Sequence, residues 1–220
     1  MAESQTSSTQ ATLRHETRGA ILIAASRLLA YPDHALRALL PDIAAYLVDL
    51  PVGDSANITD AAPRLVRVAE RLREADSAEL EARYVVTFDL QEPTSLYLTA
   101  HELGDSRRRG QALAELRAML RVAGFEESGD ELPDFLPLLL EFLAHAPADM
   151  PADAVTALEQ RIAAVCERIQ GHLDADNLYY DVFGALRDVF PSSVEADPDK
   201  RFSGREQADT GEMPYPLHYD

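Results

Sequence analysis

Leu132-Pro133-Asp134-Phe135-Leu136-Pro137-Leu138-Leu139-Leu140-Glu141-Phe142 is the stretch of sequence that decides the fold. Its side chains are apolar nearly all round a helix, so the segment offers no wholly polar side to solvent. Such a helix is either buried at the centre of a helical domain or leaves one apolar face open for a partner. The two interpretations can hold for different faces, and in the second we expect Asp134 and Glu141 at the rim of a groove.

The rest of the chain also has the apolar spacing of helices, and only residues 85–88 resemble a strand, between helical neighbours. The pattern defines both bounds of the helices expected over Leu13–Ala30, Ala35–Leu39, Pro41–Leu50, Pro133–Ala146, Pro151–Gln170 and Ala175–Phe190. Others are expected to begin at an N-terminal cap, one at Thr59 or Asp60 and one at the capping box of Asp76 and Glu79. Further helices are expected from Thr94 or Ser95 to near Gly104 and from Asp105 or Ser106 to Gly124. The sequence therefore predicts an all-α single domain of about eight to nine helices over residues 13–190.

The two ends differ from this domain in composition. Residues 1–12 are expected to form a flexible N-terminus, and residues 191–220 an acidic, flexible C-terminal tail. In that tail seven acids face three bases, and the apolar periodicity ends. Its last part, residues 213–219, is apolar enough to dock onto a protein surface.

Charge excludes several classes of partner. The chain has 20 Lys and Arg against 38 Asp and Glu, a net charge of −18, so it repels nucleic-acid backbones and anionic membranes but attracts basic peptides. Its apolar runs are too short to span a bilayer, and the N-terminus does not resemble a secretory signal. A single cysteine, Cys166, fits a reducing compartment, so we expect a cytoplasmic protein with no membrane insertion.

Catalytic motifs are missing from the sequence. The six histidines are not paired at the spacing of two ligands on one helix face, and His101-Glu102-Leu103-Gly104-Asp105 departs from a zinc-protease helix at its fifth position. Cys166 lies beside an apolar helical stripe and is expected to be a buried, inert thiol. We predict a protein that is not an enzyme and that has neither catalytic nor metal-ligating residues.

Acidic residues are concentrated around the apolar helix quoted above. Between Arg121 and Arg161 there is no Lys or Arg, whereas nine acids occur: Glu126, Glu127, Asp130, Glu131, Asp134, Glu141, Asp149, Asp153 and Glu159. A positively charged amphipathic helix would suit a groove in this region, with its apolar face inward and its basic residues on the acidic rim.

Several blocks of sequence resemble a known family. They are Tyr84–Leu90 (YVVTFDL), Ser95–Thr99 (SLYLT), Gly104–Leu113 (GDSRRRGQAL), Ala123–Glu126 (AGFE) and Glu131–Pro137 (ELPDFLP), in this order. Together they look like the central blocks of the NarJ-type nitrate reductase assembly chaperones, also called the nitrate reductase delta subunit, within the TorD-like group. The resemblance covers roughly residues 15–190 and is densest from 84 to 146.

The resemblance implies an all-helical chaperone that binds the catalytic subunit of a respiratory nitrate reductase at its basic, leader-like N-terminal segment. It implies that the chaperone keeps this subunit competent for insertion of the molybdopterin guanine dinucleotide cofactor before membrane docking, without itself binding the cofactor stably. We expect a monomer or weak dimer.

Carried over by position, the family's pattern of a Tyr followed by an apolar–Phe pair falls on Tyr84, Thr87 and Phe88, and its Pro-Asp signature on Pro133 and Asp134. Relatives that serve other reductases often have His after this Asp, where Phe135 stands here. The full expected peptide-binding set is Tyr84, Thr87, Phe88, Asp89, Leu96, Tyr97, Pro133, Asp134, Phe135, Leu140 and Glu141. Each of Tyr84, Phe88 and Leu140 fits the core better than the groove.

Three alternatives stay open at this point. The chain can serve a different molybdoenzyme, although Phe135 argues against it. It can be a small helical enzyme acting on a cationic substrate, or a structural subunit of a stable complex.

Overall fold

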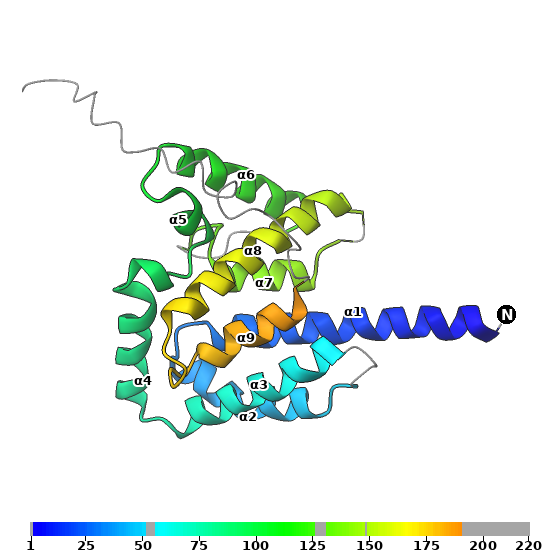
Figure 1. Ribbon diagram of the computed structural model, residues 1–220, viewed down its shortest axis with the longest axis horizontal. Helices are drawn as coiled ribbons and strands as arrows, with labels where there is room; N and C mark the ends of the chain where they lie inside the picture. The colour runs from blue at the N-terminus through cyan, green and yellow to red at the C-terminus, as the bar shows by residue number, and fades with distance from the viewer. Residues whose placement is uncertain (1, 52–55, 126–130, 148, 191–220) are drawn as a thin grey trace, which may run out of the picture.

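The computed structural model describes residues 2–51, 56–125, 131–147 and 149–190, and the side chains of 1–12, 14 and 56–59 are not described. Within these ranges the chain is helical and contains no strand beyond one isolated β-bridge, which confirms the predicted all-α fold (Figure 1). The predicted C-terminal tail, 191–220, lies outside the described residues.

The chain contains eleven helical elements within the described residues. In chain order they are α1 (Ala2–Leu28), α2 (His34–Val48), α3 (Ala56–Glu74), α4 (Ser77–Tyr84), the π-helical segment η1 (Val85–Asp89), the 3-10 turn η2 (Glu92–Thr94), α5 (Leu98–Leu103), α6 (Arg108–Val122), α7 (Leu136–Ala144), α8 (Ala152–His172) and α9 (Tyr180–Val189).

These helices form a bundle whose long members pack in pairs: α1 with α7, α2 with α3, α3 with α9, and α8 with α9. The helices α5 and α6 lie at one end of the bundle and α2 and α3 at the other, while the N-terminal part of α1 projects beyond it (Figure 1). The backbone of α1 is helical from Ala2, well before the predicted start at Leu13.

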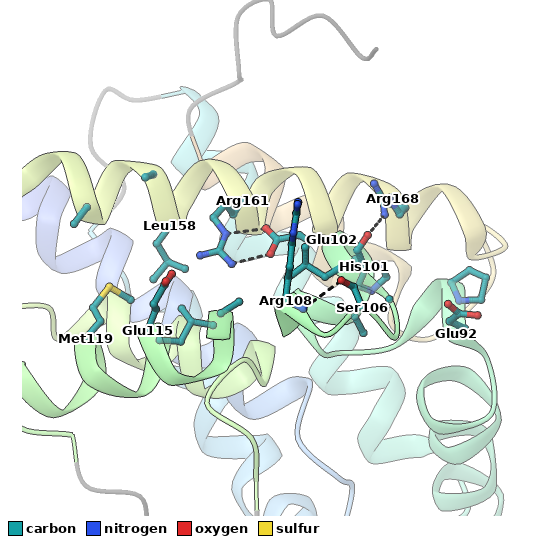
Figure 2. A pocket seen from close by; sticks show the side chains of 18 of the residues that line it. Glu92, His101, Glu102, Ser106, Arg108, Glu115, Met119, Leu158, Arg161 and Arg168 are labelled. Carbon is teal, nitrogen blue, oxygen red and sulfur yellow. Dashed lines mark hydrogen bonds and ion pairs between the residues drawn. The ribbon is translucent and has the colours of Figure 1, made fainter. Parts of the chain in front are cut away.

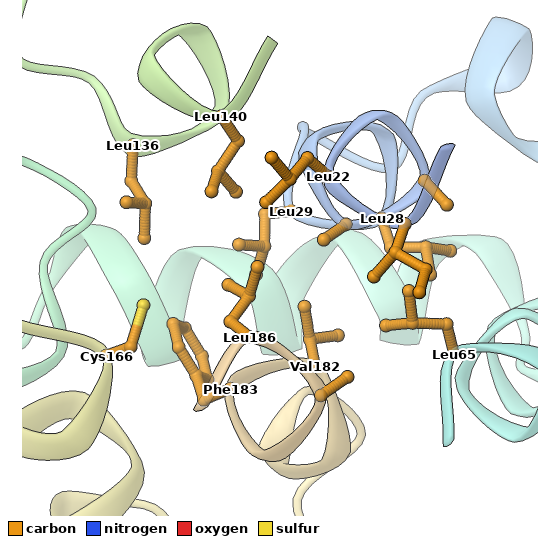
Figure 3. Packing of buried hydrophobic residues seen from close by; sticks show 14 of the residues in the cluster. Leu22, Leu28, Leu29, Leu65, Leu136, Leu140, Cys166, Val182, Phe183 and Leu186 are labelled. Carbon is orange, nitrogen blue, oxygen red and sulfur yellow. The ribbon is translucent and has the colours of Figure 1, made fainter. Parts of the chain in front are cut away.

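The apolar stretch 132–142 lies at the centre of the bundle. Leu136, Leu139, Leu140 and Phe142 have no exposed side-chain surface. Figure 3 shows Leu140 of α7 beside Leu22 and Leu29 of the α1 region and Leu136 pointing toward Cys166 of α8, with α9 beyond them. For these faces the interpretation as a central core helix is confirmed.

Several predicted helix starts are wrong: α3 begins at Ala56 and not after a cap at Thr59 or Asp60, α5 begins at Leu98 and not at Thr94 or Ser95, and α9 begins at Tyr180 and not at Ala175. Two further differences have a clear physical cause. Proline removes a helical hydrogen bond, so a break was expected at Pro41. Instead α2 is continuous, because Leu36, Leu40 and Leu47 hold it against the core on both sides of that proline. The helix predicted from Pro133 begins at Leu136, because residues 134–136 are hydrogen-bonded to another segment instead.

Helix starts are predicted better where a side chain supplies the cap. The Asp76 carboxylate accepts hydrogen bonds from the backbone N–H groups of Ala78 and Glu79 at the start of α4. Asp33 does the same for Leu36 at the start of α2. Gly124 has the left-handed conformation expected of a residue that ends a helix, with φ 79°.

One short pairing joins two distant segments and fixes the end of the bundle near α5. The backbone N–H of Leu98 donates to the carbonyl of Asp134 at 2.9 Å, and that of Leu136 donates to the carbonyl of Leu96 at 2.8 Å. This places Tyr97 directly opposite Phe135. The pairing explains why α7 starts late: its first residues serve as a bridge partner.

The buried Asp134 carboxylate stabilises this pairing. It is fully buried and accepts hydrogen bonds from the Thr99 backbone N–H, at 3.1 Å, and from the Thr99 hydroxyl. Arg109 Nε donates to the same hydroxyl oxygen at 3.1 Å, and its Nη2 lies 3.9 Å from the carboxylate. Because Thr99 is in the first turn of α5, the negative charge of Asp134 also lies at the positive N-terminal end of that helix, which is a favourable interaction.

We predict that Leu140→Ala lowers the free energy of unfolding by about 2 to 5 kcal/mol, because it leaves a cavity in a packed core. Urea unfolding followed by circular dichroism measures the change. Leu90→Ala is the matched control: that side chain is 71% exposed, so its change should stay within about 0.5 kcal/mol. Equal effects of the two substitutions would contradict the central position of α7.

Asp134→Ala should cost about 2 to 4 kcal/mol of stability, because the buried Thr99 N–H and hydroxyl lose their acceptor and the Arg109 guanidinium loses a nearby negative charge. Asp134→Asn keeps one acceptor oxygen and should cost less. The same unfolding measurement checks both, with Asp89→Ala as the exposed-acid control. An Asp134→Ala protein as stable as the wild type would show that the carboxylate does not lock the pairing.

Candidate functional site

Most of the predicted peptide-binding residues face the interior. Seven of them have buried side chains: Tyr84, Thr87, Phe88, Leu96, Pro133, Asp134 and Leu140. The expectation that Asp134 lies at an exposed acidic rim is wrong, because its carboxylate caps α5 instead. The preference for Tyr84, Phe88 and Leu140 as core residues is confirmed.

Tyr84 is the centre of a buried aromatic cluster. Its ring lies edge-on to those of Tyr31, Phe88 and Tyr179, with centroids 5.4, 5.0 and 6.0 Å away. Its hydroxyl donates to the carbonyl of Leu29 at 3.0 Å, and burial raises its pKa. Tyr84 is thus a neutral donor that ties the end of α4 to the end of α1.

Four predicted residues do reach the surface: Asp89 is exposed, and Tyr97, Phe135 and Glu141 are half-buried. The rings of Tyr97 and Phe135 lie 5.4 Å apart across the bridge. The Tyr97 hydroxyl donates to the Glu131 carboxylate at 2.9 Å, and Leu132, 36% exposed, precedes Phe135 by one turn.

The surface extends from Asp89 towards the end of α1. Leu90, next to Asp89, is the most exposed apolar residue of this region. Tyr31 contacts Tyr84 with its ring, and its hydroxyl donates to Glu81 at 3.3 Å. We call this set the acidic aromatic surface, and it consists of Tyr31, Glu81, Asp89, Leu90, Tyr97, Glu131, Leu132 and Phe135.

The carboxylates make this surface electronegative. Burial, followed by the hydrogen bond and charge of Glu131, raises the pKa of Tyr97 to about 12, and Asp89 adds to the shift. The pKa of Tyr31 is raised as well, with contributions from Glu81 and Asp89 after desolvation. Both tyrosines are therefore neutral at physiological pH, and both lie in a field that favours a cation nearby.

Glu141 has a different partner from the one expected. Its carboxylate lies 3.4 Å from Nη2 of Arg27 and is one third exposed. It thus links α7 to α1, and no contact joins it to the acidic aromatic surface among the described residues.

Sequence reasoning missed five members of this surface: Tyr31, Glu81, Leu90, Glu131 and Leu132. Tyr31 directly follows the helix predicted over Leu13–Ala30, and Glu131 is one of the nine acids in the interval without Lys or Arg. The available signal was local, since Leu90 ends the block Tyr84–Leu90, and Glu131 and Leu132 begin the block Glu131–Pro137. What the sequence did not show is that these two blocks meet.

A separate cavity of about 960 Å³ lies between α5, α6 and α8 (Figure 2). His101 lines it, and its Nε2 lies 2.6 Å from the carbonyl oxygen of Ser95; burial lowers the pKa of this histidine. In the described part of the chain no cluster of three His, Cys, Asp or Glu side chains is arranged to hold a metal ion. Cys166 is fully buried, as predicted.

Among the described residues, no helix is both long and apolar enough to cross a membrane.

Comparison with known proteins identifies the family. A family model described as "Nitrate reductase delta subunit" matches residues 53–175. The chain is 32% identical over 180 residues to the nitrate reductase molybdenum cofactor assembly chaperone NarJ of Escherichia coli strain K12, covering 80% of this chain and 72% of that one. It is 30% identical over 163 residues to the corresponding probable chaperone of Bacillus subtilis strain 168, covering 74% and 84%.

These names describe assembly chaperones, in agreement with the prediction of a protein that is not an enzyme. The matched range contains every sequence block on which the resemblance rests, from Tyr84 to Pro137. The resemblance inferred from those blocks is confirmed, and the chain belongs to the nitrate reductase delta subunit family.

Proposed function

We propose that this protein is an assembly chaperone for a respiratory nitrate reductase, and that it binds the basic, leader-like N-terminal segment of the catalytic subunit. Binding takes place in the cytoplasm, before the complex docks at the membrane, while the molybdopterin guanine dinucleotide cofactor is inserted into the client. Family membership and the names of the relatives support the general role. The acidic aromatic surface supports the recognition of a basic segment.

The observation that carries this proposal is the half-buried Tyr97–Phe135 pair: the Tyr97 hydroxyl is bonded to Glu131, and its pKa is raised further by Asp89. An amphipathic helix presents apolar side chains at every third or fourth position and charged ones beside them. Its apolar side chains would rest on the two rings and on Leu90 and Leu132. Its Lys and Arg side chains would then lie next to Asp89 and Glu131, where charge-assisted hydrogen bonds form.

The buried residues of the predicted set have a supporting role in this proposal. Asp134 and Thr99 hold the backbone of Tyr97, and Tyr84 and Phe88 hold the segment that carries Asp89 and Leu90. A surface that is ordered before binding avoids part of the entropic cost of association. The chaperone itself has no need to bind the cofactor, and it acts as a monomer or weak dimer.

Calorimetric titration with a synthetic peptide of about 15 residues, four helical turns, from the N-terminus of the catalytic subunit tests the charge part of this proposal. Glu131→Lys should weaken binding about three- to tenfold at low salt, since it replaces an attraction with a repulsion. The difference should shrink as salt is raised. Asp42→Lys on α2 is the matched control, an exposed acid distant from this surface, and should bind like the wild type. Equal affinities of the two variants would refute the site.

The apolar part is tested by Leu90→Ala, which should leave folding intact and weaken the same peptide several-fold. Because this contribution comes from buried apolar area, the loss should persist in high salt, unlike that of Glu131→Lys. Val122→Ala is the matched control, since Val122 is 84% exposed on α6, away from the surface. If Leu90→Ala binds as tightly as Val122→Ala at every salt concentration, Leu90 is not part of the site.

A further inference from the structure

A second cavity, of about 360 Å³, lies where the end of α4 and the segment η1 meet the turn between α8 and α9. Figure 1 shows this turn beside α4. Thr87 and Tyr179 line the cavity and are buried, so they form its inner side, whereas Ala82 and Val86 are exposed at its opening. Its volume is near the lower end of the range for small-ligand sites, about 300 to 1,000 Å³. The cavity therefore fits one side chain and not a whole helix.

The two walls of this cavity are held in place by contacts within the chain. On the far wall, Arg71 of α3 donates to the carbonyl of Asp176 at 2.6 Å, and the Asn177 side chain accepts a hydrogen bond from the Tyr179 N–H at 2.9 Å. The Tyr179 ring then packs on Phe88 of η1, with centroids 4.9 Å apart, which joins the two walls. A cavity that is ordered before binding avoids part of the entropic cost of association.

The lining of this cavity carries no net charge. Its two charged side chains are bonded to each other, because Nε and Nη2 of Arg83 donate to Glu79 Oε1 at 3.0 and 2.7 Å. Burial raises the pKa of the Tyr179 hydroxyl, so this side chain is neutral as well. An ionised group entering here would lose its hydration without meeting an unpaired opposite charge. In contrast to the acidic aromatic surface, the cavity favours an apolar occupant.

An exposed apolar ridge joins the cavity to the acidic aromatic surface. The Leu90 N–H donates to the carbonyl of Val85 at 3.0 Å, which closes a π-helical turn. Val86, 51% exposed, therefore lies one turn before Leu90 on the same side of this segment. Val86 lines the cavity, and so does Gln91, which follows Leu90 directly. A bound helix that rests on Leu90 thus has the opening of the cavity within reach of its next turn.

We propose that this cavity accepts one large apolar side chain, such as Leu or Phe, of the client segment that binds the acidic aromatic surface. The inference rests on the proposed function and adds a second requirement to it. Asp89 and Glu131 recognise the basic residues of the segment, and the cavity fixes the register of the segment by the position of one apolar residue. A basic segment that lacks this residue binds more weakly.

Filling the opening of the cavity tests this proposal. Calorimetric titration with the same reductase peptide should show binding about tenfold weaker for Ala82→Trp, because the new ring occupies the space of the apolar side chain. Ala78→Trp is the matched control, since Ala78 is exposed one turn earlier on α4 and does not line the cavity. It should bind like the wild type. An Ala82→Trp protein that binds as tightly as Ala78→Trp would overturn the proposal.

A series of peptides, each with one apolar residue replaced by Ala, identifies the occupant. One replacement should weaken binding to the wild type about tenfold. It should have no further effect on Ala82→Trp, because both changes remove the same contact. Additive losses at every peptide position would overturn the proposal.

The Glu131→Lys variant distinguishes this inference from the proposed function. If Glu131→Lys weakens peptide binding and Ala82→Trp does not, only the role of the cavity is refuted. If the wild type does not bind the peptide at all, the proposed function and the role of the cavity are refuted together.

Discussion

The hydrogen bonds of the buried Asp134 carboxylate hold together the end of the bundle that contains α5 and the start of α6. The carboxylate holds the first turn of α5 through Thr99, and through the same residue it holds Arg109 at the start of α6. It also fixes the backbone pairing that sets Tyr97 opposite Phe135. An unpaired buried charge is costly, so the arrangement persists only because Thr99 and Arg109 are in place. The first turn of α5 and the start of α6 are thereby held in one geometry with residues 134–136, which lie far from them in the sequence.

This constraint gives the Pro-Asp signature of the family a physical meaning. Asp134 was expected to contact the client, but its carboxylate is buried and instead positions Tyr97 and Phe135, which we propose as contact residues. The exposed members of the acidic aromatic surface come from two parts of the sequence. Asp89 and Leu90 follow Tyr84 and Phe88, and Glu131 and Leu132 precede Pro133. In this account the site is an ordered acidic surface with apolar rings at its centre. Its specificity comes from apolar contact and charge together, neither of which requires a catalytic group.

The sequence predicted the parts of the structure that depend on local chemistry. Helices with a clear apolar stripe, such as α8, and caps such as Asp76 were placed almost correctly, because their causes lie within a few residues. The predictions that failed concern residues whose conformation depends on partners distant in the sequence. Pro41 is tolerated because α2 is packed on both sides of it, and α7 starts late because its first residues bond to the segment before α5. The role of Asp134 and the exposure of Tyr31 and Leu90 depend on how distant segments pack against one another, which the sequence alone does not show.

The most direct measurement of the central claim is a structure of the complex in solution between this protein and the N-terminal peptide of the reductase catalytic subunit. Intermolecular nuclear Overhauser effects identify which side chains touch. The account predicts contacts from apolar peptide side chains to the rings of Tyr97 and Phe135 and to Leu90, with no change in the Asp134–Thr99 hydrogen bonds. A peptide found between α6 and α8, or a complex in which Asp134 leaves Thr99 to bind the peptide, would contradict it.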